Sequence, residues 1–270
     1  MKKIIFSLSA ILLLSACKTN PFTGKNTMAL VSDSELFPSS FQQYGEFLKE
    51  NKVIKGTKDT QRVEEVGKKI KAAAELWLSA NGYKDYLKDY KWEYHLVDNN
   101  EVNAWCMPGG KIVFFTGILP YCKDDAGIAT VMGHEVSHAL ANHGQQRMSA
   151  GMLQQVGAVA LDAATAKSSA GTKQMLGAAY GLGSQYGVML PFSRAHETEA
   201  DKIGLTLMAI AGYNPEEAVA FWSRMAARSN DAGGSAFLST HPSNQQRIAD
   251  LQRLIPEAKA EAAKFGVKFK

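Results

Sequence analysis

The sequence predicts a mainly α-helical (α+β) fold with a small β-sheet. Apolar residues recur at helical spacing along most of the chain, and clear apolar–polar alternation is confined to a short stretch at residues 92–96. With 46% hydrophobic and 21% charged residues, the 270-residue chain can bury one sizeable core. The sequence shows no internal repeat, which argues against a helical-repeat array.

The N-terminus has the features of an export signal. A short basic region precedes the apolar stretch Ile4–Leu14, which is too short to span a bilayer. We therefore expect residues 1–16 to be a signal peptide and residues 17–51 to form a tether and a segment that wraps the body. The Leu-Ser-Ala-Cys that ends at Cys17 resembles the lipobox of bacterial lipoproteins, which implies lipidation of this cysteine. An ordinary secretory signal is the alternative.

A lipidated protein is held at a membrane face without spanning the membrane. The residue after Cys17 is Lys18 rather than the acidic residue linked to inner-membrane retention, so we expect a periplasm-facing lipoprotein of the outer membrane. Without the two lysines of the predicted signal the net charge is 4 − 2 = +2, and no basic run is interleaved with aromatic residues. We therefore expect no nucleic-acid partner.

Two further cysteines, Cys106 and Cys122, flank the predicted strand Lys111–Phe115. An exported protein reaches a compartment that permits disulfides, so a bridge between them is one interpretation. Two unpaired buried thiols are the other, and the sequence leaves both open. Metal ligation by this pair is disfavoured, because thiolate zinc sites usually contain closely spaced cysteine pairs.

The pattern before the central motif predicts one long helix and a small sheet. Thr60–Ala80 has an amphipathic helical pattern, and residues 92–96 alternate as in a half-buried strand. Pro108-Gly109-Gly110 predicts a hairpin-like connection into the apolar strand Lys111–Phe115. We expect Val102–Met107, on the other side of this connection, to be an edge strand.

His134-Glu135-Val136-Ser137-His138 is the motif that carries the chemistry. Its helix begins at Asp124-Asp125 and has a broad apolar face, as a buried helix should. Histidines four residues apart share one helix face and can reach one metal ion, and Glu135 can then take a proton from a water beside it. A pair of core histidines is the alternative, which the intervening glutamate disfavours. His143 fits a charge at the helix C-terminus better than a ligand.

A catalytic zinc ion needs three protein ligands and one open position, so the motif lacks one ligand. Glu197 lies 197 − 138 = 59 residues after His138, and it shares a helix face with Asp201 beside an apolar run. His241 lies in the loop before the last helix, where its side chain can point into a cleft. Ser149–Leu190 predicts a helical hairpin; a mobile segment over the site and a transmembrane hairpin are the alternatives.

Four pieces of the chain resemble, in order, the HtpX-type and BepA-type zinc metallopeptidases, a family that includes the CAAX prenyl proteases. They are Asn-Ala…Pro-Gly-Gly-Lys-Ile, His-Glu-Val-Ser-His, Ser-Arg…Glu-Thr-Glu-Ala-Asp and Thr-His-Pro…Arg-Ile, over roughly Lys91–Leu254. The resemblance implies a zincin-like helical domain over residues 52–270, whose small sheet has an edge strand beside the active-site cleft. It also implies one Zn²⁺ per chain, and it assigns residues to this ion: ligands His134, His138 and Glu197, and general base Glu135.

The resemblance also assigns roles to two further residues. Asp201 matches an acidic residue one turn after the third ligand, in a position to hold a ligand from behind or to donate a proton. His241 matches a histidine that can support the transition state or act as a fourth ligand. Several membrane spans and a helical-repeat tail, which occur in some members, are missing here. This disfavours prenyl-protein processing within a membrane and docking on outer-membrane assembly machinery.

The predicted function is that of a zinc-dependent endopeptidase (a gluzincin) in the bacterial cell envelope. We expect its substrates to be unfolded or misassembled envelope proteins, bound as extended peptides along Val102–Met107. One alternative is a chaperone-like or assembly factor whose metal site is silent or occluded by His241. Another zinc hydrolase is a weaker alternative, because the resemblance extends well beyond the five-residue motif.

Overall fold

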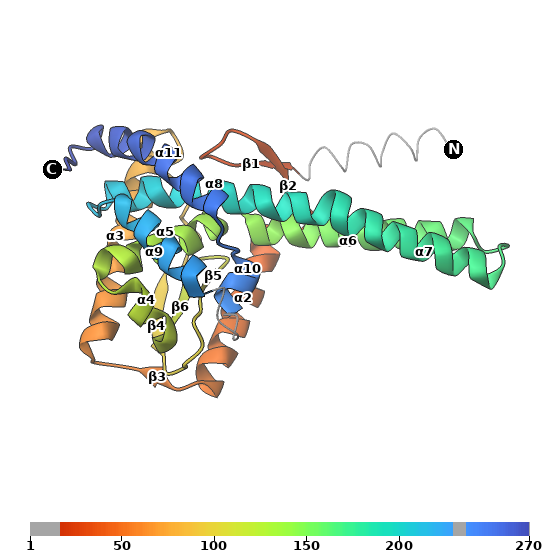
Figure 1. Cartoon of the computed structure of the whole chain (residues 1–270), viewed down its shortest axis with the longest axis horizontal. Helices are drawn as coiled ribbons and strands as arrows, with labels where there is room; N and C mark the ends of the chain where they lie inside the picture. The colour runs from red at the N-terminus through yellow and green to blue at the C-terminus, as the bar shows by residue number, and fades with distance from the viewer. Residues whose placement is uncertain (1–16, 229–235, 270) are drawn as a thin grey trace.

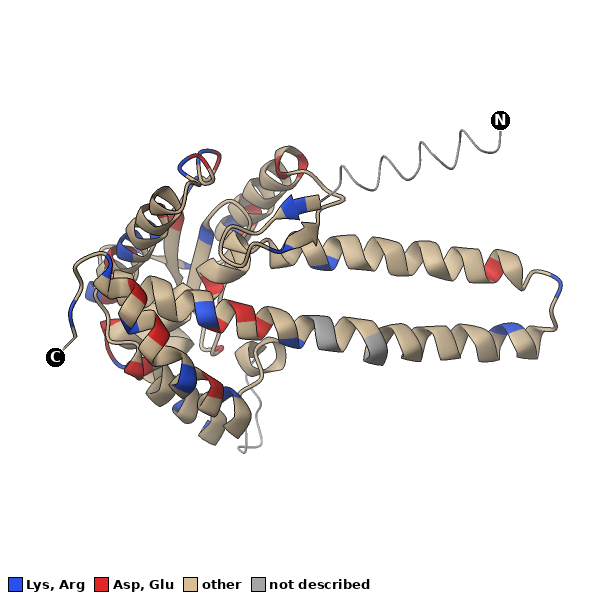
Figure 2. Ribbon diagram, turned by 90° about the horizontal axis from the view of Figure 1, so that it is seen from above, with Lys and Arg blue, Asp and Glu red and all other residues tan. Residues whose placement is uncertain are grey.

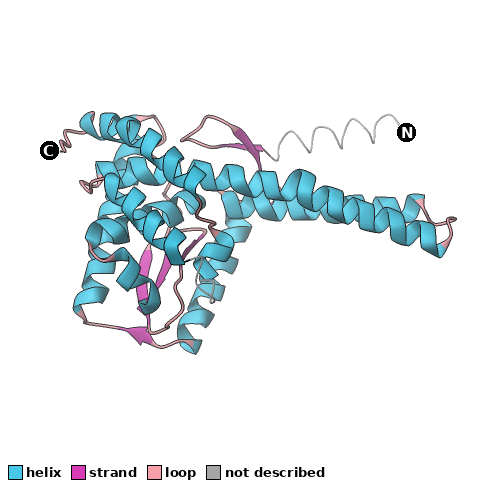
Figure 3. Ribbon diagram, in the orientation of Figure 1, coloured by secondary structure: helices cyan, strands magenta, loops and turns pink. Residues whose placement is uncertain are grey.

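Helices make up most of the chain and form two regions, a body and a projecting hairpin (Figures 1 and 3). The computed structural model describes residues 17–228 and 236–269. The body contains a four-stranded sheet, and the hairpin of α6 (His143–Ala164) and α7 (Ala170–Ser184) extends away from it. The predicted mainly α-helical fold with a small sheet is therefore confirmed. The predicted signal peptide, residues 1–16, lies outside the described residues.

The segment predicted as a tether and wrapping segment has more structure than the sequence indicated. It starts with an antiparallel β-hairpin of β1 (Cys17–Thr19) and β2 (Asn26–Met28). The 18-residue helix α2 (Asp33–Glu50) follows, begun by a capping box at Ser32. The two strands have three residues each, too few to produce a recognisable alternation in the sequence.

The sheet has the strand order β3 (Val53–Ile54), β4 (Glu93–Val97), β6 (Lys111–Phe115) and β5 (Ala104–Met107). β5 and β6 are antiparallel, and Gly109 and Gly110 in their connection both have positive φ. The predicted hairpin-like connection and the predicted edge strand are confirmed. One face of β6 packs into the main core, and α2 covers the other face through Tyr44 and Phe47.

Cys106 and Cys122 are two unpaired thiols, so the disulfide interpretation is wrong for this structure. Cys106 is paired in register with Ile112 at the start of β6, whereas Cys122 ends α4 (Leu119–Cys122), beyond the other end of that strand. The two cysteines thus lie on different elements, β5 and α4, and both are free thiols. Burial raises the pKa of both thiols and keeps them protonated.

The helices that hold the functional residues cross at the centre of the body. All residues of α5 from Gly127 to Leu140 are buried, and α5 packs on α3 and α8. These helices bury apolar side chains on every side of α5, which explains its lack of a polar face. The three helices of this centre are α3 (Lys58–Ala80), α5 (Asp125–Leu140) and α8 (Leu190–Ile210), and the other body helices that follow in the chain are α9 (Glu216–Arg228), α10 (Ala236–Thr240) and α11 (Gln245–Ala263).

The projecting hairpin confirms the helical-hairpin prediction for this stretch. α6 and α7 run side by side away from the body, and the π-helical segment η2 (Gln185–Met189) joins α7 to α8 (Figure 1). The hairpin therefore extends from the body instead of folding over the site. Within the described residues, none of the helices is both long enough and apolar enough to cross a membrane.

Candidate metal centre

Four side chains from three parts of the chain converge at the base of the hairpin. His134 and His138 come from α5, Glu197 from α8, and His241 from the loop after α10. One ligand atom from each of the four lies within 4.8 Å of the others. The residues that the sequence pattern selected as ligands are thus brought together.

The spacing of these atoms suits a tetrahedral metal ion. His134 Nε2 is 3.1 Å from His138 Nε2, and Glu197 oxygens are 3.3 Å from each of these nitrogens. Donor atoms around a tetrahedral zinc ion, at about 2.0–2.2 Å from the metal, are about 3.3–3.6 Å apart. Two imidazoles and one carboxylate are also donors that zinc prefers, so the residues present fit this ion.

His241 completes a fourth corner of the cluster. Its Nδ1 lies 3.1 Å from His134 Nε2 and 2.9 Å from Glu197 Oε2. His241 would therefore lie within reach of a metal ion held by His134, His138 and Glu197. The sequence predicted His241 to be either a fourth ligand or a support for the transition state. Both roles require its side chain to lie beside the other three residues of the cluster.

A contact between glycines holds α5 close enough to α8 for Glu197 to reach the histidines. A Cβ atom on Gly133 would lie 2.9 Å from the backbone oxygen of Gly204, and one on Gly204 would lie 2.9 Å from the backbone nitrogen of His134. Larger residues at this crossing would force the helices apart. The two backbones therefore touch next to the first histidine of the motif.

Glu135 faces the cluster from the same helix and is almost fully buried. Its Oε1 lies 3.4 Å from His241 Nε2 and has no hydrogen-bond partner among the described residues. Burial raises the pKa of this carboxyl, against the lowering effect of the neighbouring histidines. A buried carboxylate with an unused oxygen beside the metal ligands can accept a proton.

Asp201 and Arg247 form a buried ion pair behind His134. Arg247 donates two hydrogen bonds to Asp201, from Nε (2.8 Å) and Nη2 (2.7 Å), and its guanidinium lies 3.4 Å above the Trp222 ring. Asp201 Oδ1 is also 3.0 Å from His134 Nδ1. Burial raises the pKa of Asp201, but the charge of Arg247 and the hydrogen bond from His134 outweigh it, so the net shift is downward. Asp201 therefore orients the imidazole as an ionised acceptor.

His143 supports the second histidine, a contact that the sequence interpretation missed. The left-handed backbone at Asn142 (φ 58°) ends α5 and starts α6, which brings His143 Nδ1 to 2.9 Å from His138 Nδ1. The predicted role as a charge at the end of α5 is wrong, because His143 opens the next helix and its burial lowers the pKa of the imidazole. His143 also stacks on His196 and faces Glu199.

Glu197 is the carboxylate of the cluster, and its surroundings stabilise the ionised form. Burial alone would raise its pKa, but hydrogen bonds from His134, His138 and His241 lower the pKa far below its ordinary value. The ionised form is the one that ligates a metal.

Arg247 had no role in the sequence interpretation beyond its place in the Arg-Ile piece. Its partner Asp201 lies on another helix, so no local spacing indicates the pair. Proximity to His241 in the same C-terminal segment was the only available signal.

Comparison with known proteins identifies close relatives of the region that holds this cluster. Mitochondrial metalloendopeptidase OMA1 of Schizosaccharomyces pombe is 38% identical over 176 residues, which cover 65% of this chain and 50% of that protein. Human metalloendopeptidase OMA1, mitochondrial, is 28% identical over 248 residues, 89% of this chain and 46% of the relative. The beta-barrel assembly-enhancing protease of Escherichia coli is 28% identical over 166 residues, 59% of this chain and 33% of the relative.

The chain spans about half the length of the OMA1 proteins that it matches. Peptidase family M48 matches residues 59–255, well over half of the chain, and this range includes the whole cluster. The predicted metallopeptidase resemblance is confirmed for the family, while the HtpX-type and bacterial-lipoprotein parts stay predictions. The chain belongs to peptidase family M48.

Proposed function

We propose that the protein is a zinc-dependent endopeptidase that binds one zinc ion per chain. The observation that carries this proposal is the convergence of His134, His138 and Glu197, with Glu135 beside them. Membership of peptidase family M48 supports it. Asp201 and His143 hold the two histidines from behind, as hydrogen-bonding partners of ligands do in metalloenzymes.

When bound, zinc supplies a Lewis acid that polarises the scissile carbonyl and makes water acidic near neutral pH. Glu135 takes the proton of the attacking water and delivers a proton to the leaving amine. Its raised pKa suits both steps, because the carboxyl then exchanges protons more readily near neutrality. Asp201 acts as a positioning residue in this proposal, since its ion pair with Arg247 and its lowered pKa leave it without a proton to donate.

The substrate is an extended peptide that lies along the edge strand β5. A depression of about 170 Å³ adjoins this strand, and its lining includes Cys106, Met107 and the ligand His138. A peptide paired with an edge strand is held by backbone hydrogen bonds, so its sequence preference is loose. This mode suits unfolded or misassembled proteins as substrates.

Replacement of Glu135 by Gln tests the proposal. We expect cleavage of unfolded casein to fall by about 10²–10⁴-fold, because the amide cannot accept the proton. Zinc content, measured by atomic emission, should stay near one ion per chain because the ligands are unchanged. Glu50→Gln, at an exposed position at the end of α2, is the matched control. Casein cleavage that persists in the Glu135 variant would exclude this residue as the general base.

The cellular placement rests on the sequence. The lipobox-like stretch ending at Cys17 supports a lipoprotein of the bacterial cell envelope that faces the periplasm, anchored in the outer membrane. The E. coli relative is named as a beta-barrel assembly-enhancing protease, whereas the OMA1 relatives are named as mitochondrial. Metabolic labelling of wild type and Cys17→Ser with a lipid precursor tests this placement, and label on the Cys17→Ser chain would contradict it.

A chaperone-like or assembly factor with an occluded site is the second candidate. The contacts of His241 favour it, because its Nδ1 is 3.1 Å from His134 Nε2 and 2.9 Å from Glu197 Oε2. Under this function, His241→Ala should raise casein cleavage from a very low level. Under the peptidase proposal the same variant should lower cleavage, because the side chain then supports the transition state. The direction of the change separates the two.

A further inference from the structure

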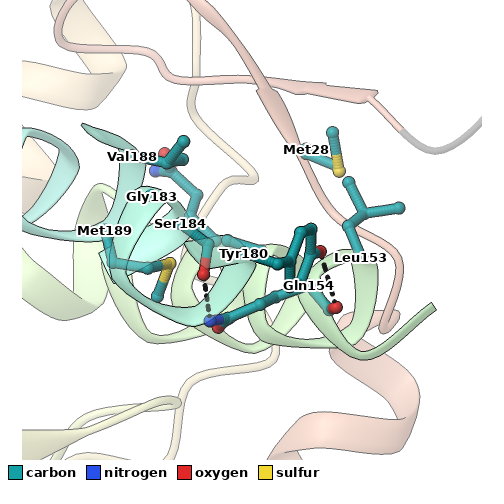
Figure 4. Close-up of a pocket in the computed structure, with 10 residues that line it drawn as sticks. Met28, Leu153, Gln154, Tyr180, Gly183, Ser184, Val188 and Met189 are labelled. Atoms are coloured by element: carbon teal, nitrogen blue, oxygen red, sulfur yellow. Dashed lines mark hydrogen bonds between the residues drawn. The ribbon is translucent and has the colours of Figure 1, made fainter. Parts of the chain in front are cut away.

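An apolar groove of about 590 Å³ opens at the root of the hairpin (Figure 4). It is lined by side chains from β2, α6, α7 and η2, and none of the four residues of the metal cluster takes part. Its volume lies within the usual range of about 300–1,000 Å³ for sites that bind small ligands. Four of its apolar lining residues are Met28, Leu153, Val188 and Met189.

Three polar lining residues, Gln154, Tyr180 and Ser184, are already hydrogen-bonded to one another. Gln154 donates from Nε2 to Ser184 Oγ (2.7 Å), and the Tyr180 hydroxyl donates to the Gln154 carbonyl (2.8 Å), as Figure 4 shows. Tyr180 can cross to α6 because Gly157 has no side chain there, and a Cβ at Gly157 would lie 2.1 Å from the hydroxyl. A ligand of this groove therefore meets hydrocarbon more than hydrogen-bonding groups.

The apolar surface continues beyond the groove along the hairpin. Ten large hydrophobic side chains stand out as exposed among the described residues, and all except Leu76 lie on β2, α6, α7 or η2. From residue 148 to residue 190 the only charged residues are Asp162, Lys167 and Lys173, near the turn between α6 and α7, and the exposed Arg147 precedes this stretch at the root of α6. The stem between root and tip therefore carries no charge (Figure 2). Contiguous exposed apolar surface of this kind marks a site of interaction.

The N-terminal strand leads directly to this surface. Cys17 is paired in register with Met28, and Met28 lines the groove. Residues 1–16 are predicted to be a signal peptide, and the predicted lipidation of Cys17 attaches this strand to a membrane. The end of the described chain at which this attachment is predicted therefore lies beside the apolar groove at the root of the hairpin.

We propose that the hairpin docks on a lipid bilayer and that the groove takes an acyl chain of a bilayer phospholipid. A single acyl chain attached at Cys17 could fill the groove, but it would leave the exposed side chains along the stem in water. A bilayer covers both, and it tolerates the stem because the charged groups of the hairpin lie at its root and its tip. The proposal does not depend on peptidase activity, and it places the metal centre close to the membrane surface.

Photo-crosslinking of the full chain tests this docking. A diazirine-bearing amino acid replaces Leu153 in the groove, Leu182 on the stem, or Leu76 on α3, which is exposed but lies in the body. The protein is reconstituted in vesicles of phosphatidylethanolamine and phosphatidylglycerol, and adducts are identified by mass. We expect a several-fold excess of phospholipid adducts at Leu153 and Leu182 over Leu76. Equal yields at the three positions, adducts with a second copy or another protein, or adducts only with a chain on Cys17 would overturn the proposal.

Hydrogen–deuterium exchange on the same vesicles supplies an independent measurement. Exchange in α6 and α7 should slow on vesicles for the wild-type chain, and a Leu153→Glu, Leu182→Glu double variant should lose this protection. Leu76→Glu is the matched control and should keep it. Circular dichroism of each variant establishes that it is folded, and since all three positions are exposed, folding should be unaffected. Unchanged exchange of the wild-type hairpin on vesicles would also overturn the proposal.

Discussion

Two helix pairs in this protein contain many small residues and use them in opposite ways. In the body, α5 and α8 touch at Gly133 and Gly204, and every residue of α5 from Gly127 to Leu140 is buried. In the hairpin, α7 has no buried residue, and its Met175 and Leu182 are largely exposed. The first pair uses small residues to bring backbones together, whereas the second leaves open space above most of them.

The two helix pairs also differ in where their charged and apolar side chains lie. Close contact in the body places charged side chains in a low-dielectric interior, where each needs a partner, and Asp201 with Arg247 meets this need. The hairpin carries almost no charge and leaves apolar side chains in contact with solvent. Body and hairpin are thus suited to chemistry and to docking, respectively.

Asp201→Asn should have the largest effect on the body. The change leaves the buried Arg247 charge without its counterion, which costs about 3–5 kcal/mol of unfolding free energy. It also weakens the orientation of His134, and loss of such a partner lowers metal affinity by about 10–100-fold. Chemical denaturation and competition with a zinc chelator measure the two effects.

The hairpin offers the matched control for this charge. Asp162 is exposed on α6, so Asp162→Asn should change stability by less than about 0.5 kcal/mol and leave metal affinity unaltered. Equal effects of the two variants would remove the distinction between a buried charge network and an exposed charge.

A substitution at the contact between α5 and α8 should have the next largest effect on stability. Gly133→Ala places a methyl group 2.9 Å from a backbone oxygen of α8, which cannot move aside as a flexible side chain would. We expect a loss of about 1–3 kcal/mol in unfolding free energy from overpacking. Thermal and denaturant unfolding measure it, and a neutral result would show that the helices can separate at no cost.

Helical periodicity explains why the ligands could be predicted from the sequence. His134 with His138, and Glu197 with Asp201, each share a helix face, so local spacing alone brings each pair to one side. The supporting contacts could not be predicted in this way. Arg247 meets Asp201 only after α8 and α11 pack together, a contact between helices far apart in the sequence.

His143 shows a second reason for incomplete prediction. A single left-handed residue, Asn142, separates α5 from α6 and turns His143 back towards His138. The groove at the hairpin root was likewise not predicted, because β2, α6 and α7 assemble it from segments far apart in sequence. Only the helical hairpin itself had a local signal, the polar stretch at its turn.

Apart from the control Asp162→Asn, Gly177→Ala should have the smallest effect on stability, and its sign should be opposite. Gly177 lies within α7, and a Cβ atom there would meet no atom within 4 Å. Alanine restricts the unfolded chain and favours helix, so we expect a gain of about 0.4–1 kcal/mol, measured by the same unfolding experiments as for Gly133→Ala. Opposite signs for one substitution in the two helix pairs would confirm that close backbone contact, and not helix propensity, decides the role of glycine in the body. A lower unfolding free energy for Gly177→Ala would instead show that this face of α7 is covered in solution.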